Sequence, residues 1–258
     1  MAGELKNRVG EKFLTNEGYE IEIIEYYGNR QCTVKFNDER GTIVANKEYA
    51  DLKKRIVKNP FHKSVYGVGY IGQGNYKGRY KKGNKTKTYN TWNAMLDRCY
   101  SEKTQEKQLT YKGCTVDERW HNFQVFAEWF ENNYNPEYME NWQLDKDILV
   151  KGNKIYSPET CVIVSNELNC LIIKTDATRG NLPIGVSKSG KKFKVNLRAG
   201  KDNRKSTYLG TFNTPEEAFQ AYKIEKEIYI KELADKYKEQ ITEDTYQALY
   251  NYQVEITD

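Results

Sequence analysis

The sequence has no long apolar run. No stretch approaches the length of about 20 residues that a helix needs to cross a bilayer, and no apolar signal region stands near the first residue. We therefore expect a soluble, intracellular protein with no membrane partner. Alanine and leucine are scarce, whereas 21 of the 258 residues are tyrosine. This composition predicts two or three domains with small, Tyr-rich cores rather than one large core.

Histidine and paired cysteine motifs are also rare. The chain has only two histidines, His62 and His121, and its five cysteines form no C-x-x-C pair. A zinc ribbon needs such pairs, so no zinc is expected. An odd number of widely spaced cysteines favours free, mostly buried thiols in a reducing compartment. These are Cys32, Cys99, Cys114, Cys161 and Cys170.

Residues 184–234 predict three short strands and one long helix. Residues 191–198 alternate basic or polar with apolar side chains, the period of a half-buried strand, and 208–212 supply the next strand. Thr214, Pro215 and Glu217 then form a helix start, with an N-cap, a proline at the first helical position and a capping glutamate. Apolar residues recur at helical spacing up to Ala234, so one helix face can cover one face of the sheet.

Basic residues dominate the same segment. The net charge of the chain is only +5, but clustering matters more than the sum for nucleic-acid binding. We predict that the face of the sheet away from the helix is basic and suits the major groove of duplex DNA. The residues expected there, against the single acid Asp202, are Lys188, Lys191, Lys192, Lys194, Arg198, Lys201, Arg204 and Lys205.

The pattern in this segment resembles the plant Apetala/ethylene-response-factor DNA-binding domain, which also occurs in phage and mobile-element proteins. The resemblance covers about a fifth of the chain, and its motif includes Gly185-Val186, Tyr208-Leu209-Gly210-Thr211-Phe212, Glu216-Glu217-Ala218 and Ala221-Tyr222. It implies base contacts from the sheet, for which Arg198 and Arg204 are available. Phe193 stands where the family usually has tryptophan, so the family's base preference is not implied. We place this domain at residues 182–240.

Two segments precede the middle of the chain. Residues 1–64 alternate in short runs separated by turn signals, which predicts a small β-barrel of the Tudor or Src-homology kind. This barrel would be a packing or docking module or would contact nucleic acid. Residues 65–88 form a connector rich in glycine, tyrosine and lysine, and they include Lys81 and Lys82. Basic residues between aromatic ones suit phosphate contact and stacking, whereas a solvated linker is the plainer alternative.

Residues 89–178 predict helices at 91–100 and 123–132, then a strand, a Gly152-Asn153 turn, a second strand and a short helix. This order is that of a ββα-metal nuclease core. The sequence motifs in this segment resemble those of a phage and prophage family regarded as HNH-endonuclease-like. These motifs are W-x-x-M-x-x-R-C-Y from Trp92, L-D-x-D from Leu144 and Y-S-P-E-x-C from Tyr156. Some members of that family carry the same C-terminal DNA-binding domain.

The resemblance implies a catalytic set that this chain matches only in part. An HNH nuclease uses a histidine as base, an adjacent aspartate, and a helix histidine or asparagine on a divalent metal such as Mg²⁺. Asp145 can be the acidic ligand, with Asn153, Asn166 or Asn169 as amide ligands. Lys146 stands where the histidine is expected, and an ordinary lysine is protonated and a poor base.

His121 is then the best available base, although a histidine at a helix start is also a common surface residue. The expected catalytic residues are His121, Asp145, Lys146 and Asn169, and the expected metal ligands are Asp145, Asn153 and Asn169. Asp145 and Asp147 are equally explained as solvated acids at a strand end.

We therefore expect a modular α+β protein of a phage or mobile element, located in the cytoplasm of a bacterial host. The modules are the N-terminal barrel, the HNH-like core and a C-terminal three-stranded sheet packed on one helix, followed by a packing tail at 241–258. The expected function is duplex DNA binding, with metal-dependent nicking in the manner of homing endonucleases. The alternatives are an inactive regulator or phage counter-defence factor on the same scaffold, and basic faces that bind an acidic host or phage protein.

Overall fold

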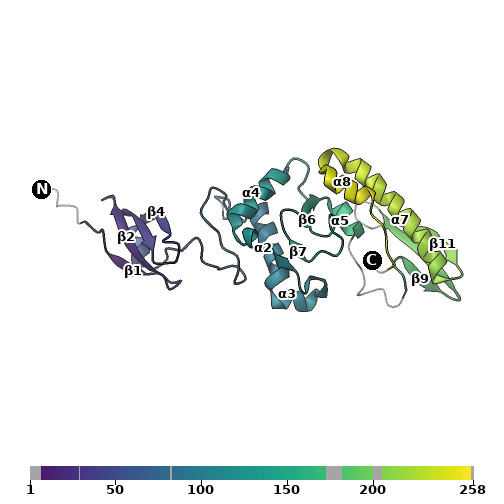
Figure 1. Ribbon diagram of the computed structural model, residues 1–258, viewed down its shortest axis with the longest axis horizontal. Coiled ribbons are helices and arrows are strands. Elements are labelled where there is room, and N and C mark those ends of the chain that lie inside the picture. Colours follow the sequence, from purple (N-terminus) through teal and green to yellow (C-terminus); the bar gives the residue numbers. More distant parts are fainter. Residues whose placement is uncertain (1–6, 29, 82, 173–181, 200–204, 257–258) are drawn as a thin grey trace. The chain divides into compact units, whose positions relative to one another are not determined.

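The computed structural model describes residues 7–28, 30–81, 83–172, 182–199 and 205–256. The fold is mixed α+β, as expected (Figure 1). The chain divides into two compact units: one contains the residues up to Tyr76 together with His121–Gln124, and the other contains Lys77–Trp120 and the chain from Val125 onward. Within the described residues, no helix combines the length and the apolar character that crossing a membrane requires.

A four-stranded antiparallel sheet forms most of the first unit. Its strands lie in chain order: β1 (Lys12–Leu14), β2 (Glu20–Tyr26), β3 (Gln31–Phe36) and β4 (Ile43–Glu48), followed by helix α1 (Tyr49–Lys53). Alternate residues of β2 and β3 are buried, including Ile21, Ile23 and Val34, and Leu52 of α1 packs against them. The β-structure predicted here is therefore confirmed, whereas α1 was not predicted.

The expected closed barrel is wrong. The sheet has β1 and β4 at its two edges, and no pairing between them closes it within residues 7–28 and 30–48. The physical reason lies in β4, which is mostly exposed and carries an extra residue near Asn46, whose φ is +54°. Such a bulge bends a strand and ends regular pairing. The chain then turns directly into α1 and does not continue round to β1.

The first half of the connector is fixed to the start of helix α4 (Phe123–Asn133). Tyr70 pairs by backbone hydrogen bonds with the segment around Asn122, and the buried Gln124 side chain bonds the backbone of Ile71 and Tyr76. A Cβ added at Gly72 would lie 2.1 Å from Asn122 Oδ1, so any larger residue would force the Asn122 side chain to shift. Up to Tyr76 this segment is a packed strap, not a solvated linker.

The second unit begins with a helical layer. Helix α2 runs from Lys87 to Tyr100, capped by the Thr86 side chain, and is followed by α3 (Glu102–Lys107). Trp92 of α2 is fully buried, and its Nε1 donates a hydrogen bond to the Trp120 carbonyl at 2.7 Å. The helices predicted at 91–100 and 123–132 are present, and α2 starts a full turn earlier than predicted.

The strand, turn, strand and helix order predicted after residue 143 is also present. Strand β6 (Gln143–Asp145) pairs antiparallel with β8 (Val162–Val164), and α5 (Asn166–Ile172) follows. The intervening loop turns at Gly152, whose φ is +75°. It also contains β7 (Ile155–Tyr156), which pairs in parallel with β5 (Thr115–Val116). We call residues 143–172 the ββα hairpin.

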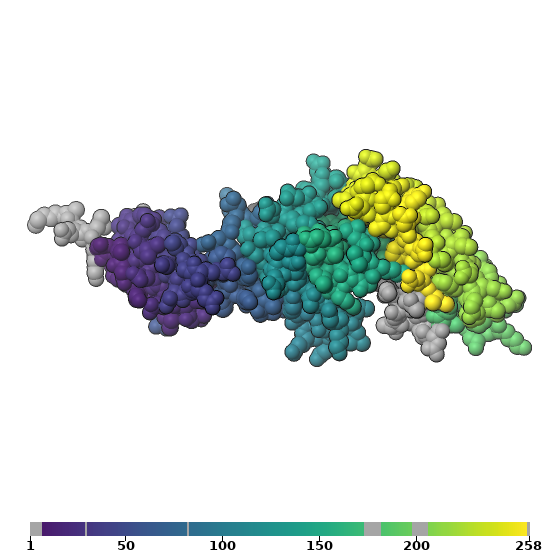
Figure 2. Space-filling model, in the orientation of Figure 1, coloured from purple at the N-terminus to yellow at the C-terminus, as the bar shows by residue number. Residues whose placement is uncertain are grey.

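The C-terminal part of the unit is a three-stranded sheet followed by helices. The sheet order is β11 (Lys205–Phe212), β10 (Lys192–Ala199) and β9 (Val186–Ser189). Helix α7 (Pro215–Tyr237) lies along one face of this sheet (Figure 1), and its start has the predicted capping box between Thr214 and Glu217. Helix α8 (Glu243–Tyr250), the yellow surface segment in Figure 2, packs against α7.

One hydrophobic core joins the ββα hairpin to the C-terminal sheet and helices. It includes Val164 and Leu168 of the hairpin, Val195 of β10 and Ile230 of α7. Burial of these side chains is the main favourable term holding the two parts together. The surfaces of the hairpin and the sheet are therefore presented by one packed body.

Candidate nucleic-acid interface

The strand register decides which side chains of the C-terminal sheet face away from α7. Val195 pairs with Val186 and Gly210, and Phe193 pairs with Phe212. These apolar residues face the core under α7. Directly opposed residues in an antiparallel pair share a face, and neighbours along a strand alternate. The open face therefore carries Ser187, Lys192, Lys194, Asn196, Tyr208 and Thr211.

The predicted basic residues are distributed differently from the expectation of one common face. Lys192 and Lys194 are exposed on the open face. Lys188 is exposed but pairs with Phe193, so its side chain emerges on the side of α7. Lys191 is exposed in the turn after Gly190, whose φ is +62°.

Several predicted residues fall partly or wholly outside the described part of the chain. Arg198 pairs with Ser206 and Lys205 with Ala199 along the backbone, while the side chains of Arg198 and Lys205 are not among those described. Lys82, Lys201 and Arg204 lie outside the described residues.

Tyr208 is a candidate contact residue that the sequence argument did not assign. Its ring is 58% exposed on the open face, and Lys194 Nζ lies 5.4 Å from the ring centroid. Its hydroxyl shares a 2.6 Å hydrogen bond with Thr211 Oγ1, which fixes the ring. An ordered aromatic ring beside an ammonium can contact both a base and a phosphate. Strict alternation from the core-facing Phe212 would place Tyr208 on the core side, and the bulge between Tyr208 and Gly210 turns it outward, so alternation alone gave no signal for this residue.

A second basic surface precedes α2. From Gly78 to Thr86 the chain forms a hairpin, closed by hydrogen bonds from Thr86 N to the Gly78 carbonyl and from Tyr80 N to the Asn84 carbonyl. We call residues 77–87 the basic hairpin. Its exposed basic and aromatic residues in the described part are Lys77, Arg79, Tyr80, Lys81 and Lys85. Tyr80 is 60% exposed, so the second half of the connector presents cations and an aromatic ring on a defined turn.

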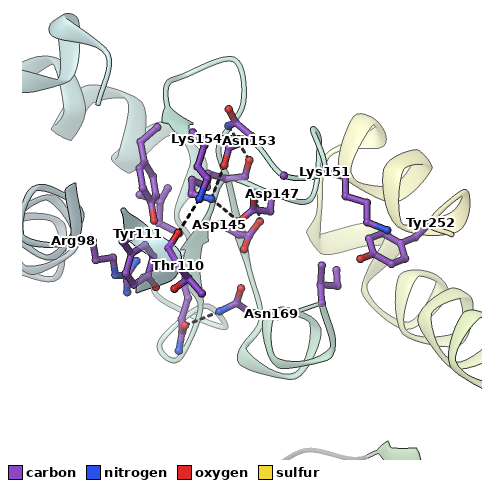
Figure 3. A pocket seen from close by; sticks show the side chains of 16 residues that line it. Arg98, Thr110, Tyr111, Asp145, Asp147, Lys151, Asn153, Lys154, Asn169 and Tyr252 are labelled. Carbon is purple, nitrogen blue, oxygen red and sulfur yellow. Dashed lines mark hydrogen bonds and ion pairs between the residues drawn. The ribbon is translucent and has the colours of Figure 1, made fainter. Parts of the chain in front are cut away.

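The ββα hairpin borders a pocket of about 520 Å³ (Figure 3). Four of the predicted site residues line it together: Asp145, Lys146, Asn153 and Asn169. Residues from α2, the turn at 109–111 and the C-terminal segment complete the wall. His121 belongs to the first unit, where its carbonyl accepts a hydrogen bond from Tyr70 N, and the pocket is formed by the second unit alone.

Asp145 ends strand β6 and caps the turn that follows. Its Oδ1 accepts hydrogen bonds from Asp147 N at 2.7 Å and from Ile148 N at 2.9 Å. Burial of the carboxyl raises its pKa despite these two donors. Asp145 therefore shapes the turn and is held in an environment that disfavours its charge.

Lys146 supplies a cation inside the hairpin. Its side chain is buried, and Nζ donates to Asp147 Oδ2 at 2.6 Å and to the Asn153 carbonyl at 2.7 Å. The ammonium also lies 5.8 Å from the centroid of the Tyr156 ring. At the position where the HNH resemblance predicts a base, this chain has a buried donor that closes the loop.

The ligand set predicted around Asp145 is incomplete for a divalent metal. The Asn153 amide is committed to its own turn, because Oδ1 accepts from Ile155 N and Nδ2 donates to the carbonyls of Lys146 and Ile155. Asn169 Nδ2 donates to Gln143 Oε1 at 2.8 Å. Across the described residues, no group of three or more histidine, cysteine, aspartate or glutamate side chains is placed to hold a metal ion. We therefore derive no step through a metal.

The cysteines are free thiols, as predicted, and four of the five are buried. Burial raises the pKa of Cys99 to about 12, and it also raises the pKa of Cys161. Thiols in this state are poor nucleophiles and poor metal ligands, so we assign Cys99 and Cys161 to the core.

No family model, no curated protein and no solved structure matches this chain. The resemblances to the Apetala/ethylene-response-factor and HNH families therefore remain predictions.

Proposed function

We propose that this protein binds duplex DNA through the open face of its C-terminal sheet, in the manner expected of an Apetala/ethylene-response-factor-type domain. The observation that carries the proposal is the exposed pair of Lys194 and Tyr208 on a sheet fixed by α7, with Lys192 beside it on the same strand. A two- or three-stranded ribbon fits the major groove, where polar side chains read base edges and lysines neutralise phosphates.

The basic hairpin supplies a second, sequence-independent contact. Its exposed lysines and Arg79 attract the phosphate backbone, and Tyr80 offers a ring for stacking. Arg79 also donates to the Gly83 carbonyl at 2.8 Å, which stiffens the turn that carries these side chains. A fixed basic turn loses less conformational entropy on binding than a free linker does.

The ββα hairpin supports binding rather than cleavage. Its buried cation Lys146 is already paired, and the Asn153 amide expected as a metal ligand is occupied within its own turn. The proposed role is thus a DNA-binding regulator or counter-defence protein of a phage or mobile element, acting in the cytoplasm of its bacterial host. Metal-dependent nicking in the manner of homing endonucleases is the alternative, motivated by Asp145 and Asn169 lining one pocket.

DNA binding is tested by fluorescence anisotropy with a random pool of labelled duplexes. We expect the double variant Lys192→Gln and Lys194→Gln to weaken binding by about tenfold or more, and to lower the slope of log affinity against log salt by about two. The matched control is Lys103→Gln with Lys107→Gln, which removes the same charge from exposed positions on α3. Equal affinity for wild type and the sheet variant would move the binding surface elsewhere.

Cleavage is tested on supercoiled plasmid carrying sites selected from that pool, with Mg²⁺, Mn²⁺ or chelator. We expect no nicking above the chelator control under any condition. Metal-dependent nicking that Asp145→Asn abolishes would establish the alternative and overturn the binding-only role.

A further inference from the structure

Two cations in the pocket wall have no acidic partner. Within the described part of the chain, Arg98 and Lys154 take part in no ion pair. Arg98 lies over the Tyr111 ring, 5.4 Å from its centroid, and Lys154 Nζ donates only to the Thr110 carbonyl at 2.9 Å. Both therefore meet at the turn formed by residues 109–111. This end of the pocket is suited to an anion.

The other cations of the pocket are neutralised. Lys146 is paired with Asp147, and Lys151 lies 3.6 Å from Glu255 Oε1 while its ammonium faces the Tyr252 ring at 5.0 Å. Figure 3 shows Arg98 and Tyr111 on one side of the pocket, and Lys151 with Tyr252 on the opposite side. One end is thus positive, and the other presents an aromatic ring and no surplus charge.

The pocket is also too large for an inorganic anion alone. Its volume is about 520 Å³, within the range of about 300–1,000 Å³ that is typical for small-molecule sites. The polar side chains of Asn169 and Gln143 also line the pocket; they hydrogen-bond to each other and have further hydrogen-bonding capacity. A ligand with an anionic group, a polar part and a flat ring matches this lining.

We propose that this pocket binds one nucleoside monophosphate unit. The phosphate lies against Arg98 and Lys154, and the base lies toward Tyr252. The same unit can come from a free mononucleotide or from an unpaired, 5′-phosphorylated nucleotide at a DNA end. The site is separate from the sheet surface of the proposed function and does not require that surface to bind DNA.

Isothermal titration calorimetry on the full chain tests this site with deoxyadenosine 5′-monophosphate, deoxyadenosine and inorganic phosphate as probes. We expect the monophosphate to bind at least tenfold more tightly than either part. Lys154→Gln is expected to weaken its binding about tenfold, because a charge-assisted contact is lost. Lys103→Gln is the charge-matched control and is expected to change nothing.

Arg98→Gln should weaken the monophosphate further. Arg98 is half-buried, so its variant is first checked by circular dichroism; Lys154 is exposed, and its variant alone decides the matter if Arg98→Gln unfolds. Inorganic phosphate binding as tightly as the monophosphate would reduce the site to an anion site and overturn the proposal. Wild-type affinity in Lys154→Gln would do the same.

The two sources are separated with a duplex that carries one unpaired 5′-phosphorylated 2-aminopurine. A fluorescence change that is lost in Lys154→Gln identifies the DNA end as a source, whereas binding of the free monophosphate alone identifies a free nucleotide. The sheet variant Lys192→Gln with Lys194→Gln keeps monophosphate binding while it loses duplex affinity. An error in the pocket proposal would therefore be seen in the monophosphate assay, and an error in the proposed sheet surface would be seen in the duplex assay.

Discussion

Glu167 Oε2 accepts a hydrogen bond from Lys236 Nζ at 2.6 Å, and this ion pair joins helix α5 of the ββα hairpin to helix α7. The glutamate side chain is only 8% exposed, and the hydroxyls of Tyr229 and Tyr237 donate to it as well. Three side chains thus converge on one carboxylate between two parts that share a hydrophobic core. These contacts of Glu167 help to fix the orientation of the C-terminal sheet relative to the ββα hairpin.

Replacing Glu167 with glutamine should lower the free energy of unfolding by about 1–3 kcal/mol, the usual effect of weakening hydrogen bonds to a buried charge. Burial alone would raise the pKa of Glu167, but the donors, led by Lys236 and Tyr237, outweigh it and hold the pKa below its usual value. The stability from its charge is therefore present above pH of about 4.3 and is lost as the pH falls through the lower folded value.

Urea denaturation between pH 3 and 8 measures this effect. The wild type and Glu167→Gln should differ at pH 7 and converge at the acid end, while the exposed Glu232→Gln on α7 should match the wild type throughout. A constant difference at every pH would mean that the glutamine acts through packing and not through charge.

Much of the fold was predictable because local patterns agree with the packing. Alternation in β2, β3 and β10 and the capping box of α7 each specify an element without knowledge of the rest. The ββα hairpin was predictable in order, and its pocket gathers Asp145, Lys146, Asn153 and Asn169 as the sequence suggested.

The rest depends on long-range contacts that alternation does not encode. Whether a strand closes a barrel depends on its edge partner, and the bulge at Asn46 is not visible as a periodicity. The packed strap at Gly72 depends on Asn122, fifty residues later. Likewise, Arg98 and Lys154 come from a helix and a loop that only the folded chain brings to one pocket.

The strap offers a matched pair of glycine substitutions. Gly67 and Gly72 both have φ near +75°, at +75° and +73°, so alanine costs about 1–2 kcal/mol at either from backbone strain. A Cβ at Gly67 meets open space, whereas at Gly72 it meets the Asn122 side chain, whose Oδ1 is held by Gln124 N at 3.0 Å. Gly72→Ala should thus cost about 1–3 kcal/mol more than Gly67→Ala in chemical denaturation. Equal losses would show that Asn122 yields without cost.

Asp145 and Asp147 should respond oppositely to neutralisation. Burial raises the pKa of Asp145, so its charged form costs stability at neutral pH, and the cost disappears as the pH falls below that raised value. Asn at position 145 keeps an oxygen for the two backbone donors, and Asp145→Asn should raise the melting temperature at pH 7.5 but not at pH 4.

Asp147→Asn should lower the free energy of unfolding by about 1–3 kcal/mol, and with it the melting temperature, because Lys146 loses its carboxylate partner. Differential scanning calorimetry at the two pH values measures the melting temperatures of both variants. If Asp145→Asn is less stable than the wild type, the charge of Asp145 stabilises the fold and the prediction is wrong.

Tyr208 should contribute to DNA affinity without contributing to folding. Its ring is 58% exposed and is oriented by Thr211 and Lys194, so Tyr208→Leu removes an aromatic contact surface while leaving the core intact. We expect duplex affinity to fall by about tenfold, which corresponds to about 1.4 kcal/mol. The melting temperature should stay within about 2 °C of the wild-type value, because exposed substitutions change stability little.

Tyr27, which is 51% exposed in the first unit, provides the control, and Tyr27→Leu should leave affinity unchanged. If Tyr208→Phe binds as weakly as Tyr208→Leu, the hydroxyl and its bond to Thr211 matter more than the ring, and the contact is a polar one.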